Sequence, residues 1–383
     1  MTDENSTLSQ LLTEQGQSPW IDNITRDMLA GGKLQELIDR GIVGLTSNPT
    51  IFQKAIGSSA LYNDAMHNLV RENKSVAEIY DALVLDDIRN AALILRQVYD
   101  SSKGHDGYVS IEVLPSLAHD TDKTLTEARR LFSGLNMPNI MIKIPGTPEG
   151  VPAFKQAIVD GINVNVTLVF SLDSYRQVAE AYVAALEERA ANGLAVDHLA
   201  SVASFFVSRV DTLIDKKLDA AAEATDDVAR KKEIAALKGK AAIANAKLAY
   251  AAYGEIFSGP RWEALAAKGA KAQRCLWAST STKNPAYRDV LYVEQLVGPD
   301  TVDTMPPATI DAFLDHGHVA RTIDQNLDEA KAQFAAIEAA GVSIDEATAE
   351  LQKDGVRLFA ESFDDLVKTI TAKREEMVAQ VGA

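Results

Sequence analysis

The chain has 383 residues, of which 46% are hydrophobic and 24% are charged, so it holds ample material for a large buried core. Its 38 Lys and Arg residues against 54 Asp and Glu residues give a formal net charge of −16. Nucleic acids and anionic membranes repel such an acidic chain, so we expect neither as a partner. An anionic small molecule is still open as a ligand, but it needs a local cluster of cations.

Short strand-like segments alternate with longer helix-like ones along most of the chain. The strand-like segments are bounded by Gly, Pro, Asn or Asp, and the helix-like ones carry apolar residues at three- and four-residue spacing. The predicted strands are residues 18–22, 42–47, 108–114, 139–144, 162–170, 199–206, 273–279 and 300–304. The predicted helices are residues 60–73, 76–100, 121–135, 172–192 and 226–252.

This alternation is typical of βαβ units, which form a parallel sheet with helices outside it. Eight strands favour a closed (β/α)8 TIM barrel of the α/β class over an open sheet. We expect a single barrel domain over residues 1–383, because no linker rich in Pro, Gly or Ser divides the chain. Residues 213–272 are predicted to form an extended, solvated helical insertion. Residues 344–380 are predicted to form two or more helices, broken near Gly355.

Cys275 is the single cysteine and lies in an apolar stretch, so we expect a buried packing residue and no intrachain disulfide. The polar, acidic start of the chain lacks the features of a secretory signal. No run approaches about 18 uninterrupted apolar residues, so no membrane span is predicted. We therefore expect a cytoplasmic protein. The sequence leaves open whether it is a monomer or a homodimer.

Lys143 is the one charged residue in the predicted strand 139–144, where it lies between Ile142 and Ile144. Burial of an ammonium ion is costly, and proteins respond by lowering a lysine pKa from about 10.4 by several units. A lysine that is neutral near pH 7 can form a Schiff base with a carbonyl group. The alternatives are an edge strand with Lys143 facing water, or a buried structural ion pair.

Other predicted strands also carry polar residues near their carboxyl ends, where barrel enzymes place their catalytic groups. Glu112 lies near the end of an apolar strand, and its alternative role is a simple pair with a lysine. Asn163, Asn165 and Thr167 share one face of a strand, which is hard to explain in a parallel sheet covered on both faces. Two more polar residues, taken alone, are no better than turn or helix-cap residues: Asp22 and Asn48.

Together these residues supply an amine nucleophile, carboxylates for proton transfer, and neutral groups that can bind substrate hydroxyls. No metal site is predicted, because the imidazoles of His316 and His318 have no third ligand nearby. No Gly-x-Gly-x-x-Gly follows a strand and no Gly-x-x-x-x-Gly-Lys-Ser/Thr occurs, so no nucleotide cofactor is expected.

Five segments of the chain closely resemble transaldolase motifs, in the order in which that family carries them. They are Leu45-Thr-Ser-Asn-Pro-Thr-Ile-Phe52, Val109-Ser-Ile-Glu-Val113, Ile140-Met-Ile-Lys-Ile-Pro145, Ile162-Asn-Val-Asn-Val-Thr-Leu-Val-Phe-Ser171 and Ser204-Phe-Phe-Val-Ser-Arg209. Each motif alone is moderately specific, and five in register are highly specific. The resemblance implies a (β/α)8 barrel of the class I, Schiff-base aldolase superfamily, without a cofactor.

By this resemblance, Lys143 is the Schiff-base lysine of a pentose phosphate pathway transaldolase, which is a transferase of sugar-phosphate substrates. The implied reaction transfers a dihydroxyacetone unit from sedoheptulose 7-phosphate to glyceraldehyde 3-phosphate, giving erythrose 4-phosphate and fructose 6-phosphate. Asp22 would be the general acid–base, and Glu112 and Thr167 would hold a catalytic water. The residues implied to bind the dihydroxyacetone hydroxyls or to line the pocket are Asn48, Asn165, Ser204 and Phe206.

Arg209 matches the family's phosphate-binding arginine, and a guanidinium suits a phosphate dianion because it offers paired N–H donors. The second phosphate element departs from the family pattern, in which a Ser-aromatic-Arg sequence follows the seventh strand. Here the segment reads Ala278-Ser-Thr-Ser-Thr-Lys-Asn284, and Ser279 aligns with the family's serine. Either Ser281 or Lys283 takes the place of the arginine, and we favour Lys283 as the second cation.

Two other functions stay open at this point. A related Schiff-base lyase would share Lys143 and Asp22, but it would cleave or form a ketose without transferring the three-carbon unit. A non-catalytic barrel that senses sugar phosphates or binds a partner would suit the acidic surface and the insertion. A requirement for an aldehyde acceptor separates the transferase from the lyase, and turnover separates both from the non-catalytic barrel.

Overall fold

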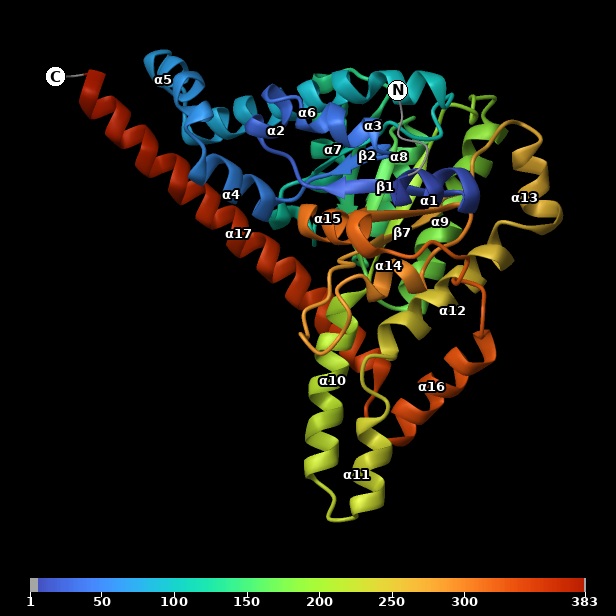
Figure 1. The fold of residues 1–383 in the computed structure, drawn as a ribbon. Coiled ribbons are helices and arrows are strands. Elements are labelled where there is room, and N and C mark those ends of the chain that lie inside the picture. The colour runs from blue at the N-terminus through green and yellow to red at the C-terminus, as the bar shows by residue number, and fades with distance from the viewer. Residues whose placement is uncertain (1–5, 382–383) are drawn as a thin grey trace.

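Eight parallel strands close into a barrel in the computed structural model, which describes residues 6–381 (Figure 1). Each strand pairs with the next along the chain, and the last pairs with the first to close the sheet. The strands are β1 (Gln17–Asp22), β2 (Gly44–Thr46), β3 (Val109–Glu112), β4 (Ile140–Pro145), β5 (Val164–Val169), β6 (Ser201–Phe206), β7 (Arg274–Ala278) and β8 (Thr301–Met305). Each overlaps one of the predicted strands, so the predicted TIM barrel is confirmed.

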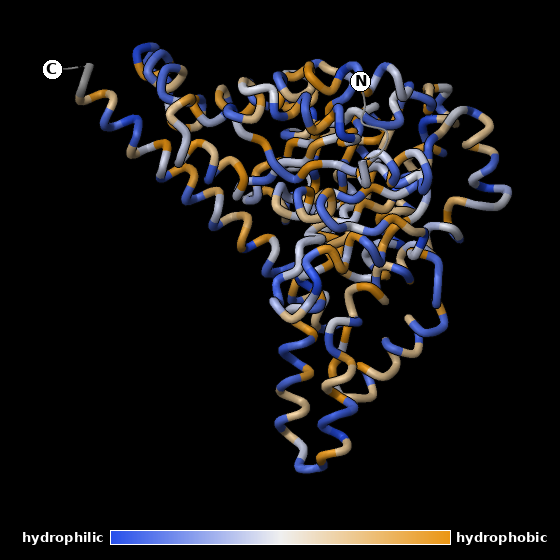
Figure 2. Tube along the Cα trace, viewed as in Figure 1, coloured by the Kyte–Doolittle hydropathy of each residue, from blue (hydrophilic) through white to orange (hydrophobic). Residues whose placement is uncertain are grey.

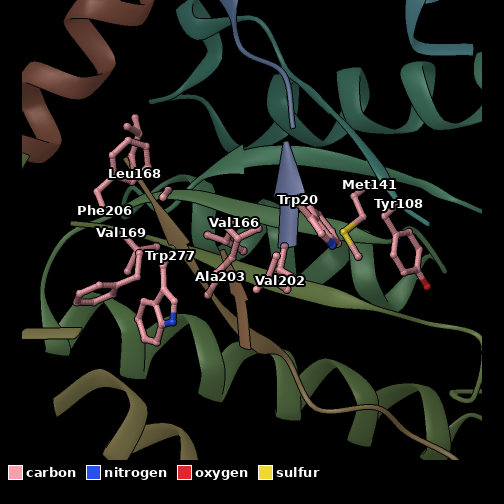
Figure 3. Close-up of a cluster of buried hydrophobic side chains, with 14 of the residues drawn as sticks. Trp20, Tyr108, Met141, Val166, Leu168, Val169, Val202, Ala203, Phe206 and Trp277 are labelled. Carbon is pink, nitrogen blue, oxygen red and sulfur yellow. The ribbon is translucent and has the colours of Figure 1, made fainter. Parts of the chain in front are cut away.

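The strands are buried on both faces, as a parallel sheet inside a ring of helices requires. Figure 3 shows Val166 of β5 gathered with Val202 and Ala203 of β6, and all three side chains are fully buried. Cys275 of β7 is fully buried as well, which confirms its predicted packing position.

The register of the sheet places several polar residues side by side. Glu112 of β3 lies beside Lys143 of β4, and Lys143 lies beside Asn165 of β5. Asp22 and Thr46 are neighbours at the ends of β1 and β2. Because alternate residues of a barrel strand point inward, this pairing brings the polar side chains together inside one end of the barrel.

Helices follow the strands and surround the barrel (Figure 1). The predicted helices 76–100, 121–135 and 172–192 are reproduced to within one residue. The helices are α1 (Thr7–Gln15), α2 (Arg26–Ala30), α3 (Lys33–Asp39), α4 (Pro49–Ser58), α5 (Asn63–Arg71), α6 (Val76–Ser101), α7 (Thr121–Leu135), α8 (Gly150–Val159), α9 (Leu172–Ala191), α10 (Ser208–Glu223), α11 (Val228–Ala235), α12 (Ala241–Ile256), α13 (Gly259–Ala266), α14 (Leu291–Gln295), α15 (Pro307–His316), α16 (Leu327–Ala339) and α17 (Ile344–Val381). Two short 3-10 turns lie at Ala60–Tyr62 and Pro115–Leu117.

The region between β6 and β7 is not one extended helix. It holds α10 to α13, of which α10 and α11 project from the barrel side by side (Figure 1). The predicted helix over 226–252 is wrong, because the chain turns between α11 and α12. Gly239 adopts a left-handed φ of 73° there, and its N–H donates to Asp215 Oδ1 at 2.9 Å. This bond holds the turn against α10.

The predicted break near Gly355 is also wrong, because α17 runs without interruption for 38 residues. Gly355 serves close packing instead, since a Cβ built there would lie 2.7 Å from Leu168 Cδ2 of β5. Figure 2 shows hydrophobic and hydrophilic residues alternating along α17, as expected for a helix with one face packed on the molecule. No helix within residues 6–381 is long and apolar enough to cross a membrane.

Candidate active site

A cavity of about 450 Å³ lies at the carboxyl ends of the barrel strands. All but two of the residues to which the resemblance gives a role in the site line this cavity, and the two exceptions, Glu112 and Asn165, lie directly behind lining residues. The predicted residues in the lining are Asp22, Asn48, Lys143, Thr167, Ser204, Phe206, Arg209, Ser279, Ser281 and Lys283. The fold therefore brings together residues that are up to 261 positions apart, from Asp22 to Lys283.

Lys143 is 5% exposed and reaches the cavity from β4. Its Nζ donates a hydrogen bond to the Ser47 carbonyl at 3.1 Å and lies 3.5 Å from Glu112 Oε2. The edge-strand alternative is wrong, because β4 is paired on both sides, with β3 and β5. Lys143 does form a buried ion pair, with Glu112, as the second alternative predicted. However, Lys143 also lines a cavity large enough for a small molecule, so the pair is not purely structural.

Glu112 and Thr167 flank Lys143 from the neighbouring strands β3 and β5. Burial raises the pKa of Glu112 to about 7, although the charge of Lys143 and its hydrogen bonding act in the opposite direction. Thr167 Oγ1 is buried without a hydrogen-bond partner in the described part of the chain, and Glu112 Oε2 has only its 3.5 Å ion pair with Lys143 Nζ. Buried oxygens without a protein partner are the groups that ordered water molecules satisfy.

Asp22 ends β1 and lines the cavity as well. Thr46 Oγ1 donates to Asp22 Oδ1 at 2.7 Å and lies 2.7 Å from Thr304 Oγ1, so Thr46 holds the carboxyl group and Thr304 in turn holds Thr46. Burial raises the pKa of Asp22 above its usual value, against the charge of Lys143, the Thr46 hydrogen bond and the charge of Arg209. A carboxyl group in this setting can both accept and donate a proton.

Neutral polar groups complete the deeper part of the cavity. Ser204 Oγ donates to Asn165 Oδ1 at 2.7 Å, and Asn165 Nδ2 donates to Ser110 Oγ at 3.2 Å. Asn48 caps α4, since its Oδ1 accepts the Ile51 N–H at 3.0 Å, and it lines the cavity as well. Asn163 does not join the site, because its side chain bonds the backbone around β4 and β6.

Cations gather at the outer rim of the cavity. Arg209 comes from α10 and Lys283 from the loop after β7, where Lys283 Nζ donates to Ser281 Oγ at 2.8 Å. Both alternatives for the second phosphate element therefore lie in the cavity wall. Partial desolvation lowers the pKa of Lys283, and the charges of Arg209 and Lys54 lower it further. None of these three cations has a carboxylate within 4.0 Å among residues 6–381, so they leave a positive field for an anion.

A family model described as Transaldolase/Fructose-6-phosphate aldolase matches residues 19–370. The chain belongs to this family. It is 47% identical to Transaldolase of Trichodesmium erythraeum, 48% identical to Transaldolase 2 of Nostoc punctiforme and 48% identical to Transaldolase 1 of Streptomyces coelicolor. These matches cover 94% of this chain and 96%, 96% and 93% of the relatives, respectively. Together they show transaldolase activity, a transferase reaction of the pentose phosphate pathway.

The residues of the cavity lining that were not found from the sequence include Thr46, Lys54 and Phe359. Thr46 lies in a predicted strand, and its position beside Asp22 follows only from the register of β1 and β2. Lys54 lies on α4, on the turn after Thr50 and Ile51, which also line the cavity, so a helical projection from Asn48 could have found it. Phe359 comes from α17, and no local sequence signal indicates that α17 reaches the site.

Proposed function

We propose that the chain transfers a dihydroxyacetone unit from sedoheptulose 7-phosphate to glyceraldehyde 3-phosphate through a Schiff base on Lys143. The observation that carries the proposal is the Lys143 amine, buried in a central strand and yet accessible from a cavity lined by Asp22 and Arg209. Two carboxyl groups near one amine, Glu112 and Asp22, provide separate proton donors and acceptors for the formation of the imine and for the cleavage that follows it.

Imine formation begins when Lys143 Nζ attacks the C2 carbonyl of the ketose phosphate. The carbonyl oxygen takes up a proton and leaves as water, and a protonated imine remains. We assign these proton transfers to a water held by Glu112 and Thr167, since Thr167 Oγ1 is buried without a protein partner and Glu112 Oε2 has only its ion pair with Lys143. The raised pKa of Glu112, at about 7, allows its carboxyl group to accept and return a proton near neutrality.

Cleavage follows when the Asp22 carboxylate removes the proton of the C4 hydroxyl. The C3–C4 bond breaks, erythrose 4-phosphate leaves as the aldehyde, and the bonding electrons pass into the protonated imine. The resulting carbanion attacks the aldehyde carbon of glyceraldehyde 3-phosphate, and Asp22 returns its proton to the new hydroxyl. Hydrolysis of the imine then releases fructose 6-phosphate and restores the free Lys143 amine.

The remaining residues are proposed to bind the substrate. Asn48 and Ser204 reach the cavity and suit the dihydroxyacetone hydroxyls, while Asn165 orients Ser204 from behind. Arg209 and Lys283 bind the phosphate with Ser279, and Lys54 adds a third positive charge at the same rim. Phe206 forms an apolar part of the wall.

The test compares turnover with and without an aldehyde acceptor. We expect erythrose 4-phosphate to be released from sedoheptulose 7-phosphate in repeated turnovers only when glyceraldehyde 3-phosphate is supplied, and no turnover in Lys143→Ala. Full turnover without an acceptor would instead support the Schiff-base lyase. Substrate binding without turnover, by folded parent protein, would support the non-catalytic barrel.

We further propose that the enzyme works in the cytoplasm. The buried, unpaired thiol of Cys275 suits a reducing compartment, where sugar-phosphate metabolism takes place. Fractionation of cells with an antibody against the chain tests this placement, and recovery from a secreted or membrane fraction would contradict it.

A further inference from the structure

The Arg209 guanidinium is held in an unusual way for a half-buried cation. It makes no hydrogen bond and no ion pair within residues 6–381, and Asp22 and Glu112 act on it only as charges at longer range. A flexible arginine without polar partners has no fixed direction, and ordering its side chain costs entropy when a ligand binds. Some other contact must therefore direct Arg209 into the cavity.

Two aromatic rings supply that contact. The Arg209 Cζ atom lies 5.3 Å from the centroid of the Phe206 ring and 5.9 Å from the centroid of the Phe359 ring. The face of an aromatic ring attracts a guanidinium at such distances, and it does so without using any of the N–H donors. Arg209 thus keeps all its donors free for a phosphate, which it binds best through paired N–H groups.

Phe359 is fixed in place by anchors on both sides of it along α17. Gln352, about two helical turns earlier, donates to the carbonyls of Gly146 and Leu168 at 2.9 and 3.3 Å. Ser362, about one turn later, accepts a hydrogen bond from Thr50 Oγ1 of α4 at 2.8 Å. The Phe359 side chain is 5% exposed and lines the cavity. The C-terminal helix thereby reaches the substrate site at one well-supported point.

We infer that Phe359 is a positioning residue for phosphate recognition. It acts with Phe206 to hold the Arg209 guanidinium toward the substrate phosphate, so that the C-terminal helix takes part in selecting phosphorylated over unphosphorylated substrates. This inference rests on the proposed role of Arg209 in phosphate binding. It assigns to Phe359 an effect on substrate affinity and selectivity, with no part in the chemistry at Lys143.

The experiment measures the preference for glyceraldehyde 3-phosphate over glyceraldehyde as acceptor, as a ratio of kcat/KM values. Phe359→Leu keeps an apolar side chain but removes the ring face. We expect this variant to lower the preference by about 3- to 10-fold, through a higher KM for the phosphorylated acceptor and little change in kcat. Phe359→Tyr retains the ring face and should restore the preference to within about twofold of the parent.

Two controls separate this role from simple packing and from the role of Arg209 itself. Leu366→Ala removes a fully buried side chain of the same helix, away from the cavity, and should lower Tm while keeping the preference. In Arg209→Met the preference for the phosphorylated acceptor should be lost. The double variant with Phe359→Leu should show the same preference as Arg209→Met alone. If Arg209→Met keeps the preference, the proposed phosphate site is wrong. If Arg209→Met loses it while Phe359→Leu keeps it, or Leu366→Ala matches Phe359→Leu, the inference is overturned.

Discussion

Glu112 gives the most specific prediction at the scale of a single residue. Burial raises the pKa of its carboxyl group to about 7, so Glu112 changes charge at neutral pH, where a proton shuttle works best. Glu112→Gln keeps the shape of the side chain and removes the titrating proton. We expect kcat to fall by about 100-fold or more, and the limb of the pH–rate profile near neutrality to disappear.

The matched control for this prediction is Asp303→Asn. Asp303 is another fully buried carboxyl whose pKa burial raises to about 7, but it does not line the cavity. The Asp303→Asn variant should therefore have the same pH–rate profile as the parent. A neutral limb that survives in Glu112→Gln, or that disappears in Asp303→Asn, would show that another group controls the profile.

The individual site residues differ in how far the sequence reveals them. Lys143 and Glu112 stand out because a charge inside an apolar strand conflicts with burial, and the resemblance to transaldolase motifs adds their roles. Phe359 gives no such signal, since a phenylalanine in an amphipathic helix satisfies the ordinary packing pattern. Only the three-dimensional path of α17 brings its ring to Arg209. Polar residues inside apolar segments can thus be predicted from the sequence as site residues, whereas apolar residues that line a site cannot.

At the scale of elements, the strands and the helices over 76–100, 121–135 and 172–192 were predicted well, while the break near Gly355 and the turn at Gly239 were not. Strand limits follow from local signals, namely short apolar runs bounded by turn residues. Gly355 and Gly239 look alike as potential breaks, but only Gly239 adopts a left-handed φ. Their outcomes differ because of distant partners, Leu168 for Gly355 and Asp215 for Gly239. Such contacts are tertiary and leave no local trace in the sequence.

The close packing of Gly355 on β5 predicts an unusual response to alanine. Within a helix, Gly→Ala normally gains about 1 kcal/mol. At Gly355 the new methyl group would meet Leu168 Cδ2 at 2.7 Å, and overpacking of a buried site typically costs about 1–3 kcal/mol. We expect Gly355→Ala to lower the free energy of unfolding by about 1 kcal/mol, measured by urea denaturation.

The comparison variant is Gly254→Ala in α12, where nothing lies within 4 Å of the added Cβ. This variant should be neutral or stabilising by up to about 1 kcal/mol. If both substitutions stabilise the protein equally, Gly355 has no special packing role.

For the whole molecule, Asp303 of β8 couples the stability of the barrel to pH. Its Oδ1 accepts a hydrogen bond from Thr280 at 2.9 Å, while its Oδ2 has no partner in the described part of the chain. Burial raises the Asp303 pKa to about 7, compared with about 3.9 in an unfolded chain. The stability that this protonated acid contributes is therefore complete below about pH 4 and is lost as the pH rises through about 7.

Asp303→Asn removes this dependence on pH. Between about pH 5.5 and about pH 8, the parent should lose about 2 kcal/mol of unfolding free energy that the variant does not lose. The difference, variant minus parent, should therefore rise by about 2 kcal/mol. Parallel urea denaturation at the two pH values measures the change. A stability difference that is the same at both values would mean that Asp303 is already ionised in the folded protein.

The charge of the whole molecule explains why the site needs its cations. A chain with a net charge of −16 repels sugar phosphates at long range. Arg209, Lys283 and Lys54 oppose this field locally, in the wall of the cavity that also contains Lys143. The fold thus places three cations and a buried amine in one cavity wall, an arrangement that suits condensation with a ketose phosphate.

Trapping of the imine is the most direct test of this chemistry. The protein is incubated with fructose 6-phosphate, reduced with borohydride, digested and mapped by mass spectrometry. We predict a stable mass increase, equal to one reduced dihydroxyacetone or hexose phosphate unit, on the peptide that contains Lys143, and no such increase in Lys143→Ala. Equal labelling of Lys143→Ala, or labelling confined to another cavity lysine such as Lys54, would contradict the assignment of the Schiff base to Lys143.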